Sequence, residues 1–218
     1  YKFSFIHIPK NGGTSIVTSL QSLHDLPYRF KGRGFLGEDR VQFDHLPLTR
    51  VAKEFPEIIS RLETYETFAT FRDPVSRFRS ALFEYIRQVK HIEPANASKQ
   101  LFFDAYQEVE DELIKRPHPI EWDLIFFRPQ SDFIFLNGKQ LIKNVLPIER
   151  LYDILIRISE ITGQEFNPPH LNATLEYRHS VAAWLGGSRK FLRRILPRDH
   201  YAKARLLGRQ VLMRPQQS

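Results

Sequence analysis

Apolar positions along this chain switch between a spacing typical of strands and a spacing typical of helices. Short apolar runs rich in aromatic and β-branched residues predict buried strands at 3–8 and 64–71. Each run leads through a turn containing Gly or Pro into a segment with helical spacing, at 14–23 and 74–91. Strands that alternate with helices in this way predict an α/β fold with a mostly parallel sheet.

The rest of the chain predicts shorter elements separated by loops. Strands are expected at 41–44, 132–136 and 140–147, helices at 49–62 with a break near Pro56, at 100–114 and at 149–162 with a stop at Gly163, and loops at 26–40, 93–99, 115–131 and 164–180. Residues 188–214 are expected to form two helices broken at Pro197. No repeat or linker-like stretch interrupts the chain, so a single domain over 1–218 is expected.

Composition excludes several classes of protein. Of the 218 residues 42% are hydrophobic and eighteen are Phe, which is enough for a large core and excludes a disordered chain. The absence of cysteine rules out disulfides, thiolate catalysis, zinc–cysteine sites and iron–sulfur clusters. We expect no metal site, because the eight His residues are scattered without a His-Glu-x-x-His pattern. No apolar run reaches about eighteen residues, so no membrane anchor is expected in this segment.

Positive charge is concentrated towards the end of the chain. The net charge is +7, and residues 188–214 hold nine of the 32 Lys and Arg residues with a single acid, Asp199. Such a stretch favours an anionic partner, whether a nucleotide, a sulfated or uronate-bearing glycan, nucleic acid or an acidic membrane. The charge alone is equally compatible with a solvated helix face followed by an Arg-rich tail.

The turn after the first predicted strand has the composition of a phosphate-binding loop. It reads Ile8-Pro9-Lys10-Asn11-Gly12-Gly13-Thr14-Ser15. Two glycines let backbone N–H groups approach a bound anion, the helix that follows presents its positive end, and Lys10 adds a charge. The pattern is not a Walker A loop, because the Lys precedes the glycines. The structural alternative is an ordinary strand–helix turn that uses Gly-Gly for its geometry.

The turn after the second predicted strand offers side chains for a second phosphate. Arg72 follows the strand, at the end where open α/β sheets bind ligands, and Ser80 lies two turns into the next helix. A guanidinium fork and a hydroxyl can hold one phosphate together. The structural alternative is that Asp73 caps the helix while Arg72 and Arg77 form surface ion pairs.

Together the two motifs resemble those of the sulfotransferases that use 3′-phosphoadenosine 5′-phosphosulfate (PAPS), in particular the carbohydrate branch with the heparan and dermatan 2-O-enzymes. The first is similar to that branch's 5′-phosphosulfate loop, His-x-Pro-Lys-Thr-Gly-Gly-Thr-Ser, with Asn11 in place of the common Thr. The second is similar to its 3′-phosphate motif, with the eight-residue step from Arg72 to Ser80 intact. Weaker similarities follow at Leu146-Pro147-x-Glu149-x-Leu151, at His170-Leu171-Asn172 and at Asp199.

The resemblance implies a P-loop-like three-layer fold, whose mostly parallel central sheet is flanked by helices. It also implies transfer of a sulfuryl group from PAPS to an acceptor hydroxyl by in-line displacement, with 3′-phosphoadenosine 5′-phosphate (PAP) as the product. Lys10 would contact the 5′-phosphate and stabilise the charge that develops as the sulfuryl group leaves. The residues implied to line the 5′ site are Asn11, Gly12, Gly13, Thr14 and Ser15, and those implied to hold the 3′-phosphate are Arg72 and Ser80.

The acceptor hydroxyl needs a general base, and His45 stands where the 2-O-branch has a catalytic His, between the two motifs. A neutral imidazole can take a proton near physiological pH. The structural alternative is a His whose ring is held by a core or turn hydrogen bond. Asp44 is then a substitute base or an orienter of the ring, and Glu38 is a more distant carboxylate of the kind other branches use. We expect His7, within the first predicted strand, to be structural.

Other functions stay open on the sequence. A P-loop nucleotide kinase conflicts with the missing Walker A pattern, and a non-enzymatic polyanion or nucleic-acid binder leaves both phosphate motifs unexplained. An inactive sulfotransferase scaffold is disfavoured by the presence of Lys10, Arg72 and Ser80. We therefore expect an enzyme whose acceptor is a glycan, an anionic one included, or a small metabolite, with no nucleic-acid partner and an open oligomeric state.

The compartment is only weakly indicated. The lack of cysteine favours a reducing cytoplasm. Because the chain opens on Tyr1 within an apolar run, we expect a longer protein, and an upstream anchor that directs it to the Golgi lumen is the alternative.

Overall fold

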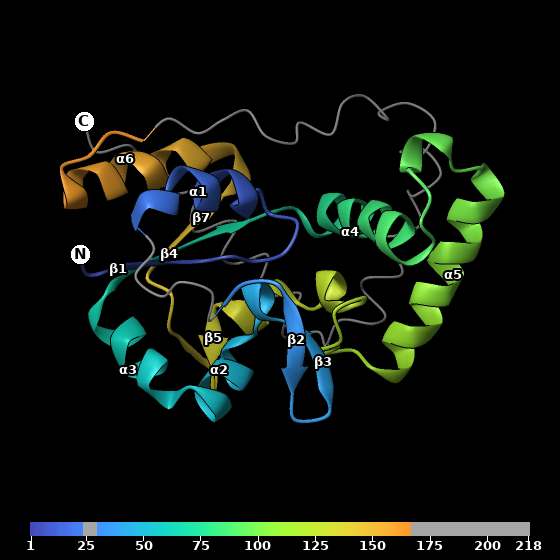
Figure 1. The fold of residues 1–218 in the computed structure, drawn as a ribbon, viewed down its shortest axis with the longest axis horizontal. Coiled ribbons are helices and arrows are strands. Elements are labelled where there is room, and N and C mark those ends of the chain that lie inside the picture. The colour runs from blue at the N-terminus through green and yellow to red at the C-terminus, as the bar shows by residue number, and fades with distance from the viewer. Residues whose placement is uncertain (24–29, 167–218) are drawn as a thin grey trace.

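A small parallel sheet lies at the centre of the computed structural model, which describes residues 1–23 and 30–166. Its strands are β1 (Phe3–Ile6), β4 (Glu66–Phe71) and β7 (Asn144–Pro147), in the order β1-β4-β7 (Figure 1). Both pairs are parallel, with Phe5 opposite Phe68 and Phe68 opposite Asn144. All three strands therefore end at the same edge of the sheet, where the turns with the two sequence motifs begin.

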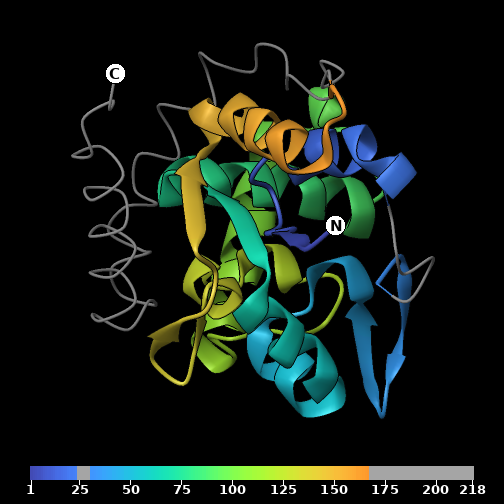
Figure 2. The same cartoon turned by 90° about the vertical axis from the view of Figure 1, so that its left-hand side faces the viewer.

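Helices α1 (Gly13–Ser19) and α6 (Leu151–Thr162) cover one face of this sheet (Figures 1 and 2). Side chains alternate between the two faces of a strand, so Phe5 and Phe68 both reach this layer. They pack with the apolar stripes of both helices, among them the fully buried Ile16. Gly163, with φ 69°, ends α6 in the left-handed conformation, so the predicted stop is confirmed.

The larger core lies on the opposite face. It joins the strands to α2 (Leu48–Glu54), α3 (Pro56–Thr64), α4 (Pro74–Val89) and α5 (Lys99–Lys115). The predicted break near Pro56 is confirmed, because this Pro is the first residue of α3 and removes the N–H that a continuous helix would need. The structure is thus a mixed α/β fold with a small parallel three-stranded sheet flanked by helices.

Short elements connect these layers. They are the 3-10 turns η1 (Gln21–Leu23), η2 (Phe43–His45), η3 (Pro94–Asn96), η4 (Ile125–Phe127), η5 (Gln130–Phe133) and η6 (Ile148–Arg150), and the strands β2 (Arg33–Leu36), β3 (Asp39–Gln42), β5 (Phe135–Leu136) and β6 (Lys139–Gln140). The strands form two antiparallel hairpins, β2–β3 and β5–β6.

The predicted loop at 26–40 is wrong in its second part, because β2 and the first half of β3 lie there. Gly37, with φ 64°, makes the tight turn between the two strands. The predicted strand at 41–44 accordingly begins earlier and ends at Gln42, where η2 takes over. Gly34 lets the ring of Phe43 pack against the hairpin, since a Cβ there would lie 2.7 Å from that ring.

The strands predicted at 132–136 and 140–147 are only partly confirmed. Asn137 (φ 50°) and Gly138 (φ 79°) form the expected turn, but each strand of this hairpin has two residues. Residues 130–133 form η5 instead. The chain then leaves the hairpin and pairs with β4 as β7, because parallel pairing in the central sheet buries Val145.

Several expectations fall on residues that lie outside the described part of the chain. They concern the basic segment 188–214, His170-Leu171-Asn172 and Asp199. Across residues 1–23 and 30–166, no helix combines the length and the apolar character that crossing a membrane requires.

Candidate functional site

The loop between β1 and α1 is strongly bent. Lys10 (φ 65°) and Gly12 (φ 77°) are both left-handed, which a Lys rarely adopts without support from its surroundings. Gly13 allows the close approach of His7, because a Cβ on Gly13 would lie 2.1 Å from the imidazole. Within the described residues, no hydrogen-bond acceptor lies on the backbone N–H groups from Lys10 to Thr14. Successive unsatisfied N–H groups in such a bend suit an anion.

Lys10 lies at the opening of this loop. Its Nζ donates to Glu84 Oε2 of α4 at 2.7 Å and lies 6.0 Å from the centre of the Phe126 ring. The Lys10 side chain is 22% exposed and that of Glu84 11%, so the pair is shielded from bulk water without being closed off. The ammonium is therefore held beside the loop and remains within reach of an entering anion.

His45 comes from η2 and lies beside the same Phe126 ring, with 6.0 Å between the ring centres. Its Nδ1 is 3.0 Å from the backbone oxygen of His7, and the two imidazoles meet edge to face at 4.5 Å. A carbonyl oxygen only accepts, so Nδ1 carries the proton and Nε2 carries the lone pair in the neutral ring. The structure thus brings Lys10 and His45 together and selects the tautomer that has its basic nitrogen at Nε2.

Burial keeps His45 neutral. Desolvation lowers the pKa of His45 to about 4, although the hydrogen bond to His7 and the charge of Asp44 oppose this, while the positive charges of Arg77 and Lys10 add to it. The pKa of His7 is also lowered, by burial first and then by His45 and Lys10. Both imidazoles are therefore uncharged at neutral pH.

The turn after β4 is organised through main-chain hydrogen bonds. Arg72 N donates to Gln130 Oε1 at 3.0 Å, and Gln130 Nε2 donates back to Arg72 O at 2.9 Å. The half-buried guanidinium reaches Lys10 O at 3.4 Å, which connects the two motifs directly. Desolvation, followed by the charge of Arg79, lowers the pKa of Arg72. Asp73 Oδ1 accepts from Ser76 N at 2.9 Å, so the expected helix cap is confirmed.

One face of α4 is turned towards the loop. Arg77 Nε donates to Pro9 O at 2.9 Å. Two turns further along the helix, Glu84 accepts from Lys10 Nζ. Ser80 lies between them on the same face, by helical spacing, and is half-buried. No hydrogen bond joins Ser80 to Arg72 in the described part of the chain, so their joint hold on a phosphate stays a prediction.

Arg77 corrects one expectation from the sequence. It does not form a surface ion pair, because its guanidinium is buried and donates to the backbone oxygens of Pro9 and Arg128. Desolvation lowers its pKa to about 9, which leaves it charged at neutral pH. Arg77 thus clamps the first loop to the segment that follows η4.

The side chains of other predicted site residues do not point to the roles expected from the sequence. Asn11 is fully buried, and its Nδ2 donates to Thr70 O and Gln130 Oε1, both at 2.7 Å, so its side chain ties the loop after β1 to β4 and to η5. Thr14 is exposed and Ser15 half-buried on α1. The carboxylate of Asp44 accepts from Gly32 N at 3.0 Å, so the His7 carbonyl, rather than Asp44, orients His45.

Glu38 lies in the turn of the β2–β3 hairpin, whose tip points away from the sheet (Figure 1). Sequence reasoning missed Glu84 and Gln130, and it expected His7 to be structural without its contacts to His45. Helical spacing from Arg77 could have placed Glu84 on the loop side of α4, whereas nothing local to Gln130 indicates a partner more than fifty residues away in the sequence.

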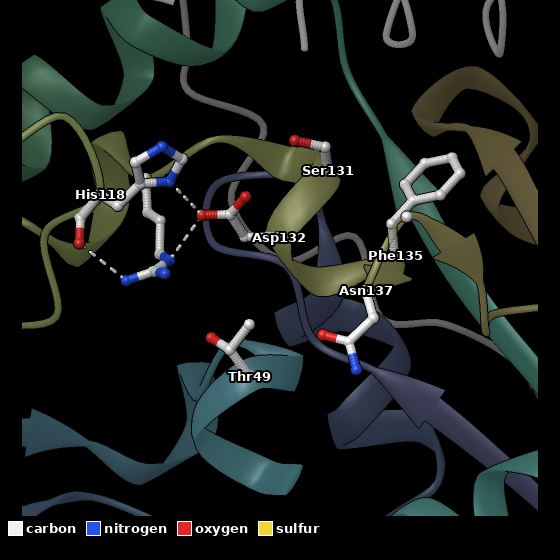
Figure 3. A pocket seen from close by; sticks show the side chains of 8 residues that line it. Thr49, His118, Ser131, Asp132, Phe135 and Asn137 are labelled. Atoms are coloured by element: carbon white, nitrogen blue, oxygen red, sulfur yellow. Dashed lines mark hydrogen bonds and ion pairs between the residues drawn. The ribbon is translucent and has the colours of Figure 1, made fainter. Parts of the chain in front are cut away.

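A cavity lies beside the segment 128–132. This cavity has a volume of about 350 Å³ and is bordered by Thr49, Asn137 and a buried ionic cluster (Figure 3). In the cluster Asp132 Oδ2 accepts from Arg128 Nε at 2.9 Å and lies 2.7 Å from His118 Nδ1. The segment thus presents Gln130 to the loop and Arg128 and Asp132 to the cavity. None of the residues predicted for the site lines it.

Comparisons with protein-family models, with curated proteins and with solved structures find no match for this chain.

Proposed function

We propose that this chain is a sulfotransferase that moves a sulfuryl group from PAPS to an acceptor hydroxyl, on a P-loop-like fold. One observation carries the proposal: the ammonium of Lys10 and the imidazole of His45 lie beside the same Phe126 ring, and Lys10 belongs to a loop whose backbone N–H groups have no acceptor among the described residues. They lie at the end of the parallel strands, where open α/β sheets bind ligands.

Each group has a distinct task in this proposal. The loop amides and Lys10 hold the 5′-phosphate, and Arg72, which contacts Lys10 O, supplies positive charge for a 3′-phosphate, with Ser80 as its partner. Bound PAPS supplies a sulfuryl group on a phosphate leaving group. Lys10 neutralises charge on the bridging oxygen as the S–O bond to phosphate breaks and the bond from sulfur to the acceptor oxygen forms.

His45 completes the reaction as the general base. The proton of the acceptor hydroxyl passes to Nε2, the nitrogen left free by the hydrogen bond to His7. The charges of Arg77 and Lys10 contribute to the low pKa of His45. An anion bound on Lys10 offsets both charges, so we expect the imidazole to be a stronger base when the donor is bound.

The acceptor is proposed as a glycan or a small metabolite with a free hydroxyl; an anionic glycan is included. The compartment stays a proposal as well, with cytoplasm favoured over a Golgi lumen.

Binding of PAP tests the proposal directly. A ligand present at a hundred to a thousand times its dissociation constant stabilises the folded protein by about 3–4 kcal/mol. We expect a rise of that size with PAP and a much smaller one with ADP, measured by thermal unfolding. A shift with ATP alone would point to a kinase. Heparin or DNA binding with a steep salt dependence, and no effect of any nucleotide, would point to a polyanion binder.

A further inference from the structure

The ammonium of Lys10 is the inner end of a chain of side-chain hydrogen bonds. Its Nζ donates to Glu84 Oε2 at 2.7 Å. The other oxygen, Oε1, accepts from Gln88 Nε2, one turn further along α4. Gln88 Oε1 in turn accepts from Arg33 Nη2, on strand β2 of the exposed hairpin. The Arg33 guanidinium itself stacks over the Trp122 ring, 3.9 Å from its centre.

Glu84 is an unusual residue for this place. The whole residue is 8% exposed, and burial by itself would raise its pKa. The charge of Lys10, the hydrogen bonds from Lys10 and Gln88 and the charge of Arg87, whose Nη2 lies 3.1 Å from Oε2, lower the pKa instead. Glu84 therefore stays ionised at neutral pH. A buried carboxylate beside a proposed phosphate site repels the anion, so electrostatics alone disfavours it there. Such a residue needs a reason other than affinity.

We propose that Glu84 is a positioning residue that fixes the Lys10 ammonium before the sulfuryl donor binds, and that Arg33 fixes the Glu84 carboxylate through Gln88. The inference rests on the proposed function. A long Lys side chain loses rotamer freedom when it is fixed. The hydrogen bond to Glu84 already fixes Lys10 in the ligand-free protein, so this entropy is not lost on binding. The charge is then already aimed at the leaving oxygen, which is where fixed charge accelerates a reaction.

This role predicts opposite effects on binding and on rate. Removal of the carboxylate takes away a repulsive charge, so Glu84→Ala binds PAP at least as tightly as the wild type, with a dissociation constant lowered about threefold. The same change frees Lys10, so PAPS cleavage with water as acceptor slows about tenfold at saturation. Glu84→Gln keeps the shape and an oxygen that accepts from Lys10, and retains most of the rate while still binding PAP more tightly.

The comparison that exposes a merely structural role uses a matched ion pair. Glu108 on α5 binds Lys90 at 2.5 Å and accepts from Tyr85 Oη at 2.8 Å, so it also ties a side chain to α4. Glu108→Ala should lower stability without moving either constant. If Glu84→Ala behaves like this control, or weakens PAP binding together with the rate, Glu84 does not position Lys10. Glu84→Gln keeps the test valid if the Ala variant is unstable.

A double-mutant cycle tests the outer part of the chain. Arg33→Ala should slow PAPS cleavage about threefold, and the Arg33→Ala, Glu84→Ala pair should be no slower than Glu84→Ala alone. Effects that multiply instead would show that Arg33 acts independently of Glu84.

Failure of the inference and failure of the proposed function give different results. A wild-type protein that neither binds PAP nor cleaves PAPS removes the proposed function, and the inference with it. A wild-type protein that does both, beside a Glu84→Ala variant within about twofold of it in rate and affinity, overturns the inference alone.

Discussion

The two strand–turn–helix units of this protein have the same order of elements but differ in how the backbone N–H groups of the turn are satisfied. In the unit of β1 and α1, two left-handed residues bend the turn, and the N–H groups before the helix have no acceptor among the described residues. In the unit of β4 and α4, Asp73 accepts from Ser76 N and Pro74 removes one donor outright. Among the described residues, the first turn leaves its backbone N–H groups without acceptors, whereas the second turn satisfies its own.

The difference shows how one sheet edge can offer two kinds of anion-binding group, backbone N–H groups and charged side chains. A backbone bend suits a phosphate regardless of what else the ligand carries, because every residue supplies an N–H. A capped helix offers only the side chains beside it, here Arg72 and the residues along one face of α4. We infer that the first unit supplies affinity for the end common to all nucleoside 5′-phosphates, and the second supplies discrimination.

Substitution of the two charged residues separates these roles and has the largest expected effect. Lys10→Ala should slow PAPS cleavage by about two to three orders of magnitude, as loss of one group that stabilises a leaving oxygen does, and weaken PAP and AMP binding alike. Arg72→Ala should weaken PAP binding and leave AMP binding unchanged, because AMP lacks the 3′-phosphate. Titration calorimetry with both ligands measures this.

The same experiment can break the comparison. Equal losses of AMP affinity in the two variants would place both residues on the same phosphate. Near-normal PAPS cleavage by Lys10→Ala would remove the loop from the reaction altogether.

Acid should destabilise the protein through His45, whose ring is hydrogen-bonded to the His7 carbonyl just after β1. The pKa of His45 is about 4 when folded, against about 6.5 in an unfolded chain. Below pH 6.5 the unfolded chain takes up a proton that folded His45 does not, so the free energy of unfolding falls as the pH falls towards 4. We expect a loss of about 2 kcal/mol between pH 7 and pH 5 from His45, in urea unfolding. His7 acts in the same direction.

His45→Asn isolates this contribution, since the Asn amide can still donate to the His7 carbonyl. The variant should show a shallower dependence on pH over that range. An unchanged dependence would mean that other groups cause the loss in acid. PAPS cleavage should fall in the same variant while PAP still binds, because the base is gone and the loop is not.

Short-range patterns were sufficient for β1 and β4 and for the order of the two motifs, whereas the strand predicted at 140–147 is confirmed only in its last part, as β7. Pro and Gly marked the turns at Gly12, Pro56, Pro74 and Gly163 correctly, because each position depends on local backbone geometry. The β2–β3 hairpin was missed, since only Gly37 and four-residue strands define it and neighbouring charges hide the alternation. Local signals are weak where strands are this short.

The sequence motifs select candidate site residues but do not indicate the contacts that these residues make. Lys10 and His45 were placed from motifs, and the structure brings them together. The inward turn of the Asn11 side chain was not foreseen, because it depends on Gln130, a partner 119 positions away. The clamp by Arg77 and the hold of Glu84 on Lys10 are also long-range, with partners 68 and 74 positions away. Such contacts can be identified only once the pairing of the strands fixes which distant segments of the chain lie next to each other.

The smallest expected effect concerns the N-terminal cap of α4 in the second unit. Asp73→Ala removes the cap of α4 and should cost about 1 kcal/mol in urea unfolding. Ser98→Ala is its matched control, because Ser98 Oγ accepts from Leu101 N at 3.1 Å and caps α5 in the same way. Both variants should bind PAP as the wild type does, since neither cap serves an anion. If Asp73→Ala alone binds PAP more than about threefold tighter, the freed N–H groups and the lost charge face the ligand. The second turn would then bind phosphate through its backbone as the first does, and the division between affinity and discrimination would not hold.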